Sequence, residues 1–243
     1  MDFDEKQINA IDESTIDKLY SIIEDDAEKM KLADVPVVFE KGKTETLSSR
    51  ITTWNNLIGG IKITGGTSMS TLSFAARDSS GNRGFVMSGH AAMEAGGIGA
   101  PIYQPAYPRQ VGTVTYYNYV FADAAWVRAP NVADDVYYQD VDRTKDVANY
   151  GDTTLGTKVY KSGISTGVTY GYVDRTYVYI EPLQDQFTAN IRINPGDSGA
   201  PVFTISGSTV NIVGVIRSGL GSSGTCFSPV TGVIQDLHVY PLY

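Results

Sequence analysis

Short strand-like segments follow one another closely from residue 61 to the end of the chain. They are rich in β-branched and aromatic residues, and turn residues such as those at 79–82 and 206–208 separate them. The predicted strands are 61–66, 73–76, 84–87, 111–115, 123–127, 158–160, 168–173, 177–180, 190–193, 202–205 and 210–216. Because little helix intervenes, the pattern predicts an all-β fold, either a sandwich or a pair of barrels.

The chain is long enough, at 243 residues, for one large β domain or two small ones with a sizeable core. Its strands fall into two halves, about 64–130 and 150–243, and we expect the polar, acid-rich segment 131–154 to link them. Residues 230–237, directly after a proline, are predicted to form a short C-terminal helix that closes the fold.

Residues 1–60 have a different pattern from the rest. Between residues 8 and 30 the apolar side chains recur on one face, as in an amphipathic helix, and Pro36 should stop that helix. We therefore expect an N-terminal helical extension, 1–60, ahead of a domain at 61–243. The extension either docks on the domain or serves as a pro-segment or an arm for a partner.

Charge and cysteine usage exclude several function classes. Residues 1–50 hold 13 acidic against 7 basic residues, and no basic stripe favours a nucleic-acid partner. No apolar run is long enough to span a membrane, and the acidic start of the chain is unlike a signal peptide. Cys226 is the only cysteine, so an intrachain disulfide and a cysteine-based metal site are excluded. We expect no cofactor and no metal, and the oligomeric state is left open.

A serine flanked by glycines lies in the turn-rich segment 194–201. Gly196 and Gly199 allow backbone dihedrals that a side chain would forbid. Successive backbone N–H groups in such a turn can point into one concavity and bind an oxyanion. The hydroxyl of Ser198 is a weak nucleophile until a base takes its proton, so the segment needs a partner.

The candidates for that partner are few, because the chain has two histidines. His90 directly follows the apolar strand predicted at 84–87. Asp123 is a lone acid in an apolar run, where a buried carboxylate needs a partner such as a histidine N–H. Base, orienting acid and nucleophile in the order His90, Asp123, Ser198 match one known order of a serine-protease triad.

Five segments around these residues resemble the chymotrypsin-like serine peptidases, specifically the bacterial streptogrisin and α-lytic protease type. They are 84–90, 123–127, 160–167, 195–199 and 214–219, in the family order. The resemblance covers about residues 61–243. It implies two six-stranded antiparallel β-barrels of trypsin-like architecture, with the catalytic site in the cleft between them. The implied function is a secreted serine endopeptidase that hydrolyses protein or peptide substrates through an acyl-enzyme.

The resemblance also assigns roles to single residues. Ser198 would attack the peptide carbonyl, His90 would accept and return the proton, and Asp123 would hold the imidazole. The N–H groups of Gly196 and Ser198 would form the oxyanion hole. Ser218 would support Asp123.

The sequence departs from the family at Ala91 and Arg192, which stand in place of cysteines. These changes remove disulfide cross-links, but the residues of the triad and of the oxyanion hole remain. In the bacterial enzymes an internal arginine pairs with the aspartate before the serine. The matching residues here are Lys161 and Asp197, and we predict that they form an ion pair that shapes the oxyanion loop.

The segment 214–219 resembles the strand that lies beside the substrate in this family, so the resemblance implies a role for it in substrate recognition. Ser218, Gly219 and Leu220 would pair with the substrate backbone as an added strand. Arg192 falls where this fold places the floor of the specificity pocket, and Arg217 falls near the same pocket. Two guanidinium groups there would favour an acidic side chain in the substrate. The alternative is that one or both point to solvent or pair with local acids.

The sequence leaves two alternatives to an active protease. One is a catalytically silent protease-fold protein that binds or assembles with partners, and the other is a zymogen held inactive by residues 1–60. Residues 163–167 also match the G-x-S-x-G nucleophile elbow. We reject that motif because a strand at 168–173, and not a helix, is predicted to follow it.

Overall fold

A computed structural model of the chain describes residues 18, 21–22, 49–139, 143–221 and 224–243. One compact unit extends over residues 48–243. The helix predicted between residues 8 and 30 lies mostly outside the described residues. Three residues of it, Lys18, Ser21 and Ile22, are described, and each is helical. None of the described helices is long and apolar enough to cross a membrane.

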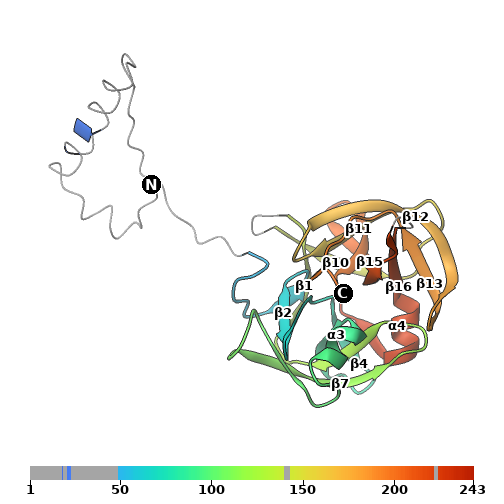
Figure 1. Cartoon of the computed structure of the whole chain (residues 1–243), viewed down its shortest axis with the longest axis horizontal. Coiled ribbons are helices and arrows are strands. Elements are labelled where there is room, and N and C mark those ends of the chain that lie inside the picture. The colour runs from blue at the N-terminus through green and yellow to red at the C-terminus, as the bar shows by residue number, and fades with distance from the viewer. Residues whose placement is uncertain (1–17, 19–20, 23–48, 140–142, 222–223) are drawn as a thin grey trace. The chain divides into compact units, whose positions relative to one another are not determined.

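The described strands of the compact unit form two sheets, whose strands gather in two groups in Figure 1. The first sheet has the order β17-β4-β5-β8-β7-β6-β2-β3, and every pairing in it is antiparallel. Its strands are β2 (Lys62–Gly65), β3 (Ser68–Thr71), β4 (Ala75–Asp78), β5 (Arg83–Met87), β6 (Pro101–Tyr103), β7 (Gln110–Asn118), β8 (Ala124–Arg128) and β17 (Val239–Pro241).

A bent segment closes this sheet into a barrel. Between β3 and β4, the backbone N–H of Ser73 donates to the carbonyl of Val86 at 2.9 Å, and the N–H of Val86 donates to Phe74 at 3.0 Å. The ladder to β5 therefore begins before β4, and β3 and β4 act as one bent strand. That strand pairs with β2 at one end and with β5 at the other, which gives a six-stranded barrel among the described residues.

The second sheet has the order β1-β9-β10-β15-β14-β11-β12-β13-β16. Its strands are β1 (Leu57–Gly59), β9 (Val132–Tyr137), β10 (Thr144–Tyr150), β11 (Lys158–Gly163), β12 (Gly167–Ile180), β13 (Leu183–Ala189), β14 (Pro201–Ser206), β15 (Thr209–Gly219) and β16 (Thr225–Pro229). Because β15 also pairs with β16, the strands β11 to β16 close into a second six-stranded antiparallel barrel within the described part. The predicted pair of six-stranded barrels is confirmed.

Two helices complete the described fold. The first, α3 (Gly89–Glu94), was not anticipated and begins directly after β5. The second, α4 (Val230–Leu237), has the bounds predicted for the C-terminal helix. Its residues Val230, Val233 and Leu237 are buried, and this apolar face packs in the core.

Two stretches differ in their strands from the sequence-based expectation. The segment 131–154, which lies between β8 of the first barrel and β11 of the second, contains β9 and β10, two strands that the sequence does not predict, and β10 pairs in parallel with β15. The strand predicted at 190–193 is irregular, and its neighbour β13 is the strand instead. Side chains, and not a neighbouring strand, pair with the backbone there. The hydroxyl of Thr225 donates to the carbonyl of Ile191 at 2.6 Å, and that of Thr169 donates to the carbonyl of Arg192 at 2.8 Å.

The core divides into three clusters, one inside each barrel and one between them. The middle cluster joins Phe74 and Val86 of the first barrel to Phe203 and Val215 of the second. Each of these side chains is at most 1% exposed. Full burial of one such side chain stabilises the fold by about 1.5–3 kcal/mol, so this middle cluster holds the two barrels together.

The compact unit also includes residues before β1. The side chain of Arg50 is buried, and its guanidinium carbon lies 4.2 Å from the centre of the Tyr137 ring. One guanidinium nitrogen donates to the carbonyl of Gly60 at 3.0 Å and to the hydroxyl of Ser162 at 2.6 Å. Arg50 therefore ties the start of the unit to strand β11 of the second barrel.

Candidate active site

His90 and Asp123 are joined by two hydrogen bonds. His90 is the second residue of α3, and Asp123 directly precedes β8, which pairs with β5. The end of β5 and the start of β8 are adjacent, so both residues lie at the same rim of the first barrel. Nδ1 of His90 lies 2.5 Å from Oδ2 of Asp123, and the backbone N–H of His90 donates to Oδ1 at 2.8 Å.

The approach of the two residues depends on the glycine between the strand and the histidine. A Cβ atom on Gly89 would lie 3.0 Å from Oδ1 of Asp123, where a side chain would crowd the carboxylate. The Asp123 side chain is fully buried, whereas a third of the His90 side chain is exposed. The carboxylate is therefore screened from water, and the outer edge of the imidazole faces the solvent-filled cleft.

The hydrogen bond that Nδ1 of His90 donates to Asp123 raises the pKa of His90 above its ordinary value. Burial opposes this rise, the charge of Asp123 adds to it, and the carboxylate of Glu94 adds a little more. The guanidinium of Arg217 acts in the opposite direction and lowers the pKa. When Nδ1 donates to Asp123, Nε2 carries no proton in the neutral ring and can act as a base.

A pocket of about 480 Å³ lies at the meeting of the two barrels. Residues of both barrels line it: His90, Tyr119, Asp123, Ile193, Asn194, Pro195, Ser198, Arg217, Ser218 and Gly219. The three residues predicted as a triad are thus brought to one pocket. Among the described residues no hydrogen bond joins the hydroxyl of Ser198 to His90. Catalytic hydrogen bonds of this kind are often long before substrate binds.

Two backbone donors in the serine loop are available. Among the described backbone groups, the N–H groups of Gly196 and Ser198 donate to no acceptor. Their neighbours are engaged, because the N–H of Asp197 donates to Asn194 at 3.0 Å and that of Gly199 to Ile216 at 2.9 Å. The predicted oxyanion donors are therefore the two that the loop leaves unpaired. Gly196 has a φ of 100°, which a residue with a side chain rarely adopts.

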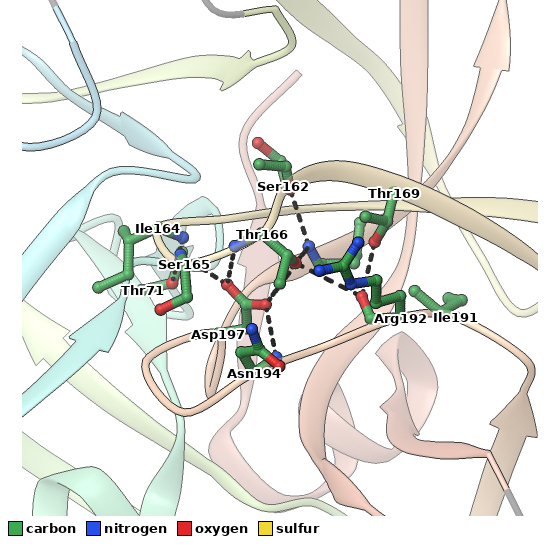
Figure 2. A network of polar contacts seen from close by, with 12 residues as sticks. Thr71, Ser162, Ile164, Ser165, Thr166, Thr169, Ile191, Arg192, Asn194 and Asp197 are labelled. Atoms are coloured by element: carbon green, nitrogen blue, oxygen red, sulfur yellow. Dashed lines mark hydrogen bonds and ion pairs between the residues drawn. The ribbon is translucent and has the colours of Figure 1, made fainter.

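The predicted ion pair between Lys161 and Asp197 is present. Nζ of Lys161 lies 3.5 Å from Oδ2 of Asp197, and both side chains are fully buried. Asp197 also accepts hydrogen bonds from the N–H of Asn194 at 3.0 Å, the N–H of Ser165 at 2.9 Å and the hydroxyl of Thr166 at 2.6 Å, as Figure 2 shows. Burial lowers the pKa of Lys161 to about 8, and the charge of Asp197 works against that shift.

The two arginines expected at the specificity pocket lie in different surroundings. Arg217 lines the pocket, and its guanidinium donates to the carbonyl of Ile180 at 2.8 Å and to that of Glu181 at 2.6 Å. Arg192 is exposed and does not line the pocket. Of the residues expected to pair with the substrate backbone, Ser218 and Gly219 line the pocket and Leu220 does not.

Ser218 lies in the pocket without the partner expected for it. Within the described part of the chain, Ser218 makes no hydrogen bond to Asp123. The register of β15 against β16 shifts between Ile216 and Ser218, a bulge at Arg217 that re-aims the side chains beyond it. Ser218 is exposed as a result.

Tyr119 was not anticipated in the site. It lines the pocket, and burial raises the pKa of its hydroxyl to about 12, with a further contribution from the charge of Asp123. Arg217 acts on the same hydroxyl in the opposite direction. Nothing in the sequence separates Tyr119 from the other tyrosines of a chain that has 16 of them. Only the fold places it beside Asp123.

Comparison with known proteins finds solved structures with a similar fold. No family model matches the sequence, and no curated protein is significantly similar to it. A Nocardiopsis protease shares 23% identity with a TM-score of 0.64, covering 77% of this chain and 100% of its own. A glutamic acid-specific serine protease shares 24% identity with a TM-score of 0.66, covering 76% and 100%. Chymotrypsin from Cellulomonas bogoriensis shares 26% identity with a TM-score of 0.61, covering 77% and 98%.

The matched structures span about three quarters of this chain and nearly their own whole length, so the likeness extends over both barrels. They are named as a protease, a serine protease and a chymotrypsin, in agreement with the resemblance carried by the five sequence segments. This chain therefore has the chymotrypsin-like fold of two β-barrels that these solved structures share.

Proposed function

We propose that the chain is a serine endopeptidase that cleaves peptide bonds through an acyl-enzyme. The observation that carries the proposal is that one pocket is lined by the His90–Asp123 pair and by Ser198, whose loop leaves two backbone N–H groups unpaired among the described residues. The bacterial serine proteases with the same fold support it.

Each group has one task in the proposed reaction. Nε2 of His90 takes the proton of Ser198 as the hydroxyl oxygen forms a bond to the substrate carbonyl carbon. The carbonyl oxygen becomes an oxyanion and accepts hydrogen bonds from the N–H groups of Gly196 and Ser198. His90 then gives the proton to the leaving amine, and the acyl-enzyme remains. Asp123 holds the imidazole in the required tautomer throughout. Water attacks the acyl-enzyme by the same steps and releases the acid.

Labelling with a fluorophosphonate probe tests this function, because the probe reacts only with an activated serine. We expect the full chain to be labelled and the Ser198→Ala variant to remain unlabelled. A zymogen would be labelled only after removal of residues 1–47, the part outside the compact unit. Absence of labelling in both the full and the shortened chain would contradict the proposal and favour a binding or assembly protein.

We propose further that the enzyme prefers an acidic residue before the cleaved bond. Arg217 lies in the pocket with its guanidinium held by two backbone carbonyls. A guanidinium has five N–H donors, so the two carbonyls leave donors for a substrate carboxylate. One matched structure is a glutamic acid-specific serine protease, which supports the same preference.

Matched peptide substrates that differ only in Glu or Gln before the cleaved bond test the preference. A hydrogen bond to a charged group is worth about 1.5–3 kcal/mol, so we expect kcat/KM to favour Glu by about tenfold to a hundredfold. The Arg217→Gln variant should lose this ratio while it keeps its reactivity with the fluorophosphonate. Equal cleavage of the two peptides by the unmodified protein would contradict an acidic preference.

We also propose that the protein acts outside the cell, as the fold group implies. Fractionation of a culture of the source organism into cells and medium, followed by detection of Ser198 labelling, tests this location. Label confined to the cell interior would contradict it.

A further inference from the structure

The turn between β11 and β12 contains a serine that the proposed reaction does not use. Ser165 lies in this turn, and its hydroxyl donates to the carbonyl of Pro195 at 2.6 Å. Its backbone N–H donates to Oδ1 of Asp197 at 2.9 Å. Ser165 therefore contacts both the residue before Gly196 and the residue after it (Figure 2 shows the second contact).

The contact with Pro195 fixes the direction of one oxyanion donor. The peptide bond between Pro195 and Gly196 is planar, and in the trans form its C=O and N–H point in opposite directions. Holding the carbonyl of Pro195 on the side of Ser165 therefore turns the N–H of Gly196 to the other side. A Cβ atom on Gly196 would lie 2.5 Å from the hydroxyl oxygen of Ser165, so the serine fits directly against this glycine.

A threonine of the first barrel holds the next carbonyls of the same loop. The hydroxyl of Thr71, at the end of β3, donates to the carbonyl of Gly196 at 2.8 Å. The backbone N–H of Thr71 donates to the carbonyl of Ser198 at 2.9 Å. Three carbonyls of the loop, those of Pro195, Gly196 and Ser198, are thus held by donors outside it. The N–H groups of Gly196 and Ser198 are the ones that no described acceptor uses.

We propose that Ser165 is a positioning residue for the oxyanion hole, which acts by holding the Pro195–Gly196 peptide with its N–H toward the pocket. Without this hydrogen bond the peptide is free to rotate, and in the rotated form a carbonyl replaces the donor. Thr71 supports the same arrangement, since its hydroxyl donates to the carbonyl of Gly196 and accepts from the N–H of Ile164, the residue before Ser165. This inference rests on the proposed peptidase function.

The test compares the Ser165→Ala variant with the unmodified protein on one peptide substrate. Ser165 is exposed, so the change removes a hydroxyl without opening a cavity. Loss of an oxyanion donor costs about 10²–10³ in kcat, and loss of its positioning group should cost part of this, about tenfold. The KM should change little. Ser165→Thr keeps a hydroxyl and should restore kcat.

Two controls separate a positioning role from a general structural one. Ser206→Ala removes an exposed hydroxyl at the far end of β14 and should leave kcat unchanged. A peptide aldehyde forms a tetrahedral adduct whose oxyanion occupies the hole, so Ser165→Ala should weaken its binding about tenfold. The matching peptide alcohol, which has –CH₂OH in place of the aldehyde and forms no tetrahedral adduct, should bind equally well to both proteins.

The outcomes distinguish this inference from the proposed function. If the unmodified protein cleaves the peptide and Ser165→Ala has the same kcat and the same aldehyde affinity, the positioning role is overturned. If Ser165→Thr fails to restore kcat, the hydroxyl is not the active group and the role is equally overturned. If the unmodified protein neither cleaves peptides nor reacts with a fluorophosphonate, the peptidase function itself fails.

Discussion

The two barrels contribute to the candidate site in different ways. The first barrel supplies His90 and Asp123, whose side chains are tied directly to each other. The second barrel supplies Ser198, whose hydroxyl has no hydrogen-bond partner among the described residues, while the backbone around it is held at almost every carbonyl.

This difference shows which parts of the site must be fixed before a substrate arrives. A base must have its tautomer set, and the pair with Asp123 does this. An oxyanion hole must present N–H groups in fixed directions, and the hydrogen bonds to the carbonyls of the serine loop do this. In the proposed reaction the hydroxyl of Ser198 has to rotate between its resting position, the attack and the departure of the product. It is the one group of the three left free to do so.

The strongest test of the first barrel's part is Asp123→Asn. The amide donates where the carboxylate accepts, so the imidazole is held in the wrong tautomer and Nε2 carries the proton. We expect kcat to fall about 10⁴-fold, as the same change does in trypsin-like enzymes, with little change in KM. Steady-state kinetics with a peptide substrate measures this. A loss below tenfold would show that the His90–Asp123 pair does not govern the base.

The matching test of the second barrel's part is Lys161→Met. The change removes the buried cation beside Asp197 and leaves a buried carboxylate without its charge partner. Removal of one member of a buried pair costs about 3–5 kcal/mol, so we expect the free energy of unfolding to fall by about that amount. Denaturant unfolding measures the loss, and kcat should fall because the loop that carries Gly196 loses its anchor. Unchanged activity would contradict the role of this pair.

Lys161→Arg is the control for that variant, since it keeps the charge. It also carries a pH prediction, because burial lowers the pKa of Lys161 to about 8. As the pH rises through 8 the lysine loses its proton and the ion pair with Asp197 is lost. The kcat of the unmodified protein should therefore decline above about pH 8. An arginine does not deprotonate in this range, so the decline should move to higher pH in the variant.

The smallest expected effect concerns the electrostatic coupling between the two barrels. The cation of Arg217, from the second barrel, lowers the pKa of His90 in the first, whereas the hydrogen bond to Asp123 raises it. His90 must be neutral to act as a base, so activity is lost as the pH falls through its pKa. Arg217→Gln should raise this pKa and move the acid side of the kcat/KM profile to higher pH. No shift, or a shift downward, would contradict the coupling.

Much of the site could be predicted from the sequence because its chemistry needs rare residue types in short patterns. A glycine-flanked serine, one of two histidines and a lone acid in an apolar run identify Ser198, His90 and Asp123. The pair of Lys161 and Asp197 followed from the family pattern, and the structure has it.

The parts that could not be predicted depend on geometry that no local pattern encodes. The bulge at Arg217 shifts the register just before Ser218, which among the described residues makes no hydrogen bond to Asp123, and the fold alone brings Tyr119 to the pocket. Strands β9 and β10 are not predicted because they carry polar and acidic residues, and although they pair with each other, their further partners β1 and β15 are far away in sequence. The role of Ser165 arises from one contact across a gap of 30 residues.

The buried Arg50 sets a limit on how the chain can mature by proteolysis. Its guanidinium reaches the hydroxyl of Ser162, the residue next to Lys161, and lies against Tyr137. A shortened form that begins after residue 50 would leave the second barrel without this cation and expose the ring that it covers. Any trimming that preserves the support of the serine loop must therefore cut upstream of Arg50. The residue itself, 8% exposed, offers a trypsin-like processing enzyme almost no side chain to bind.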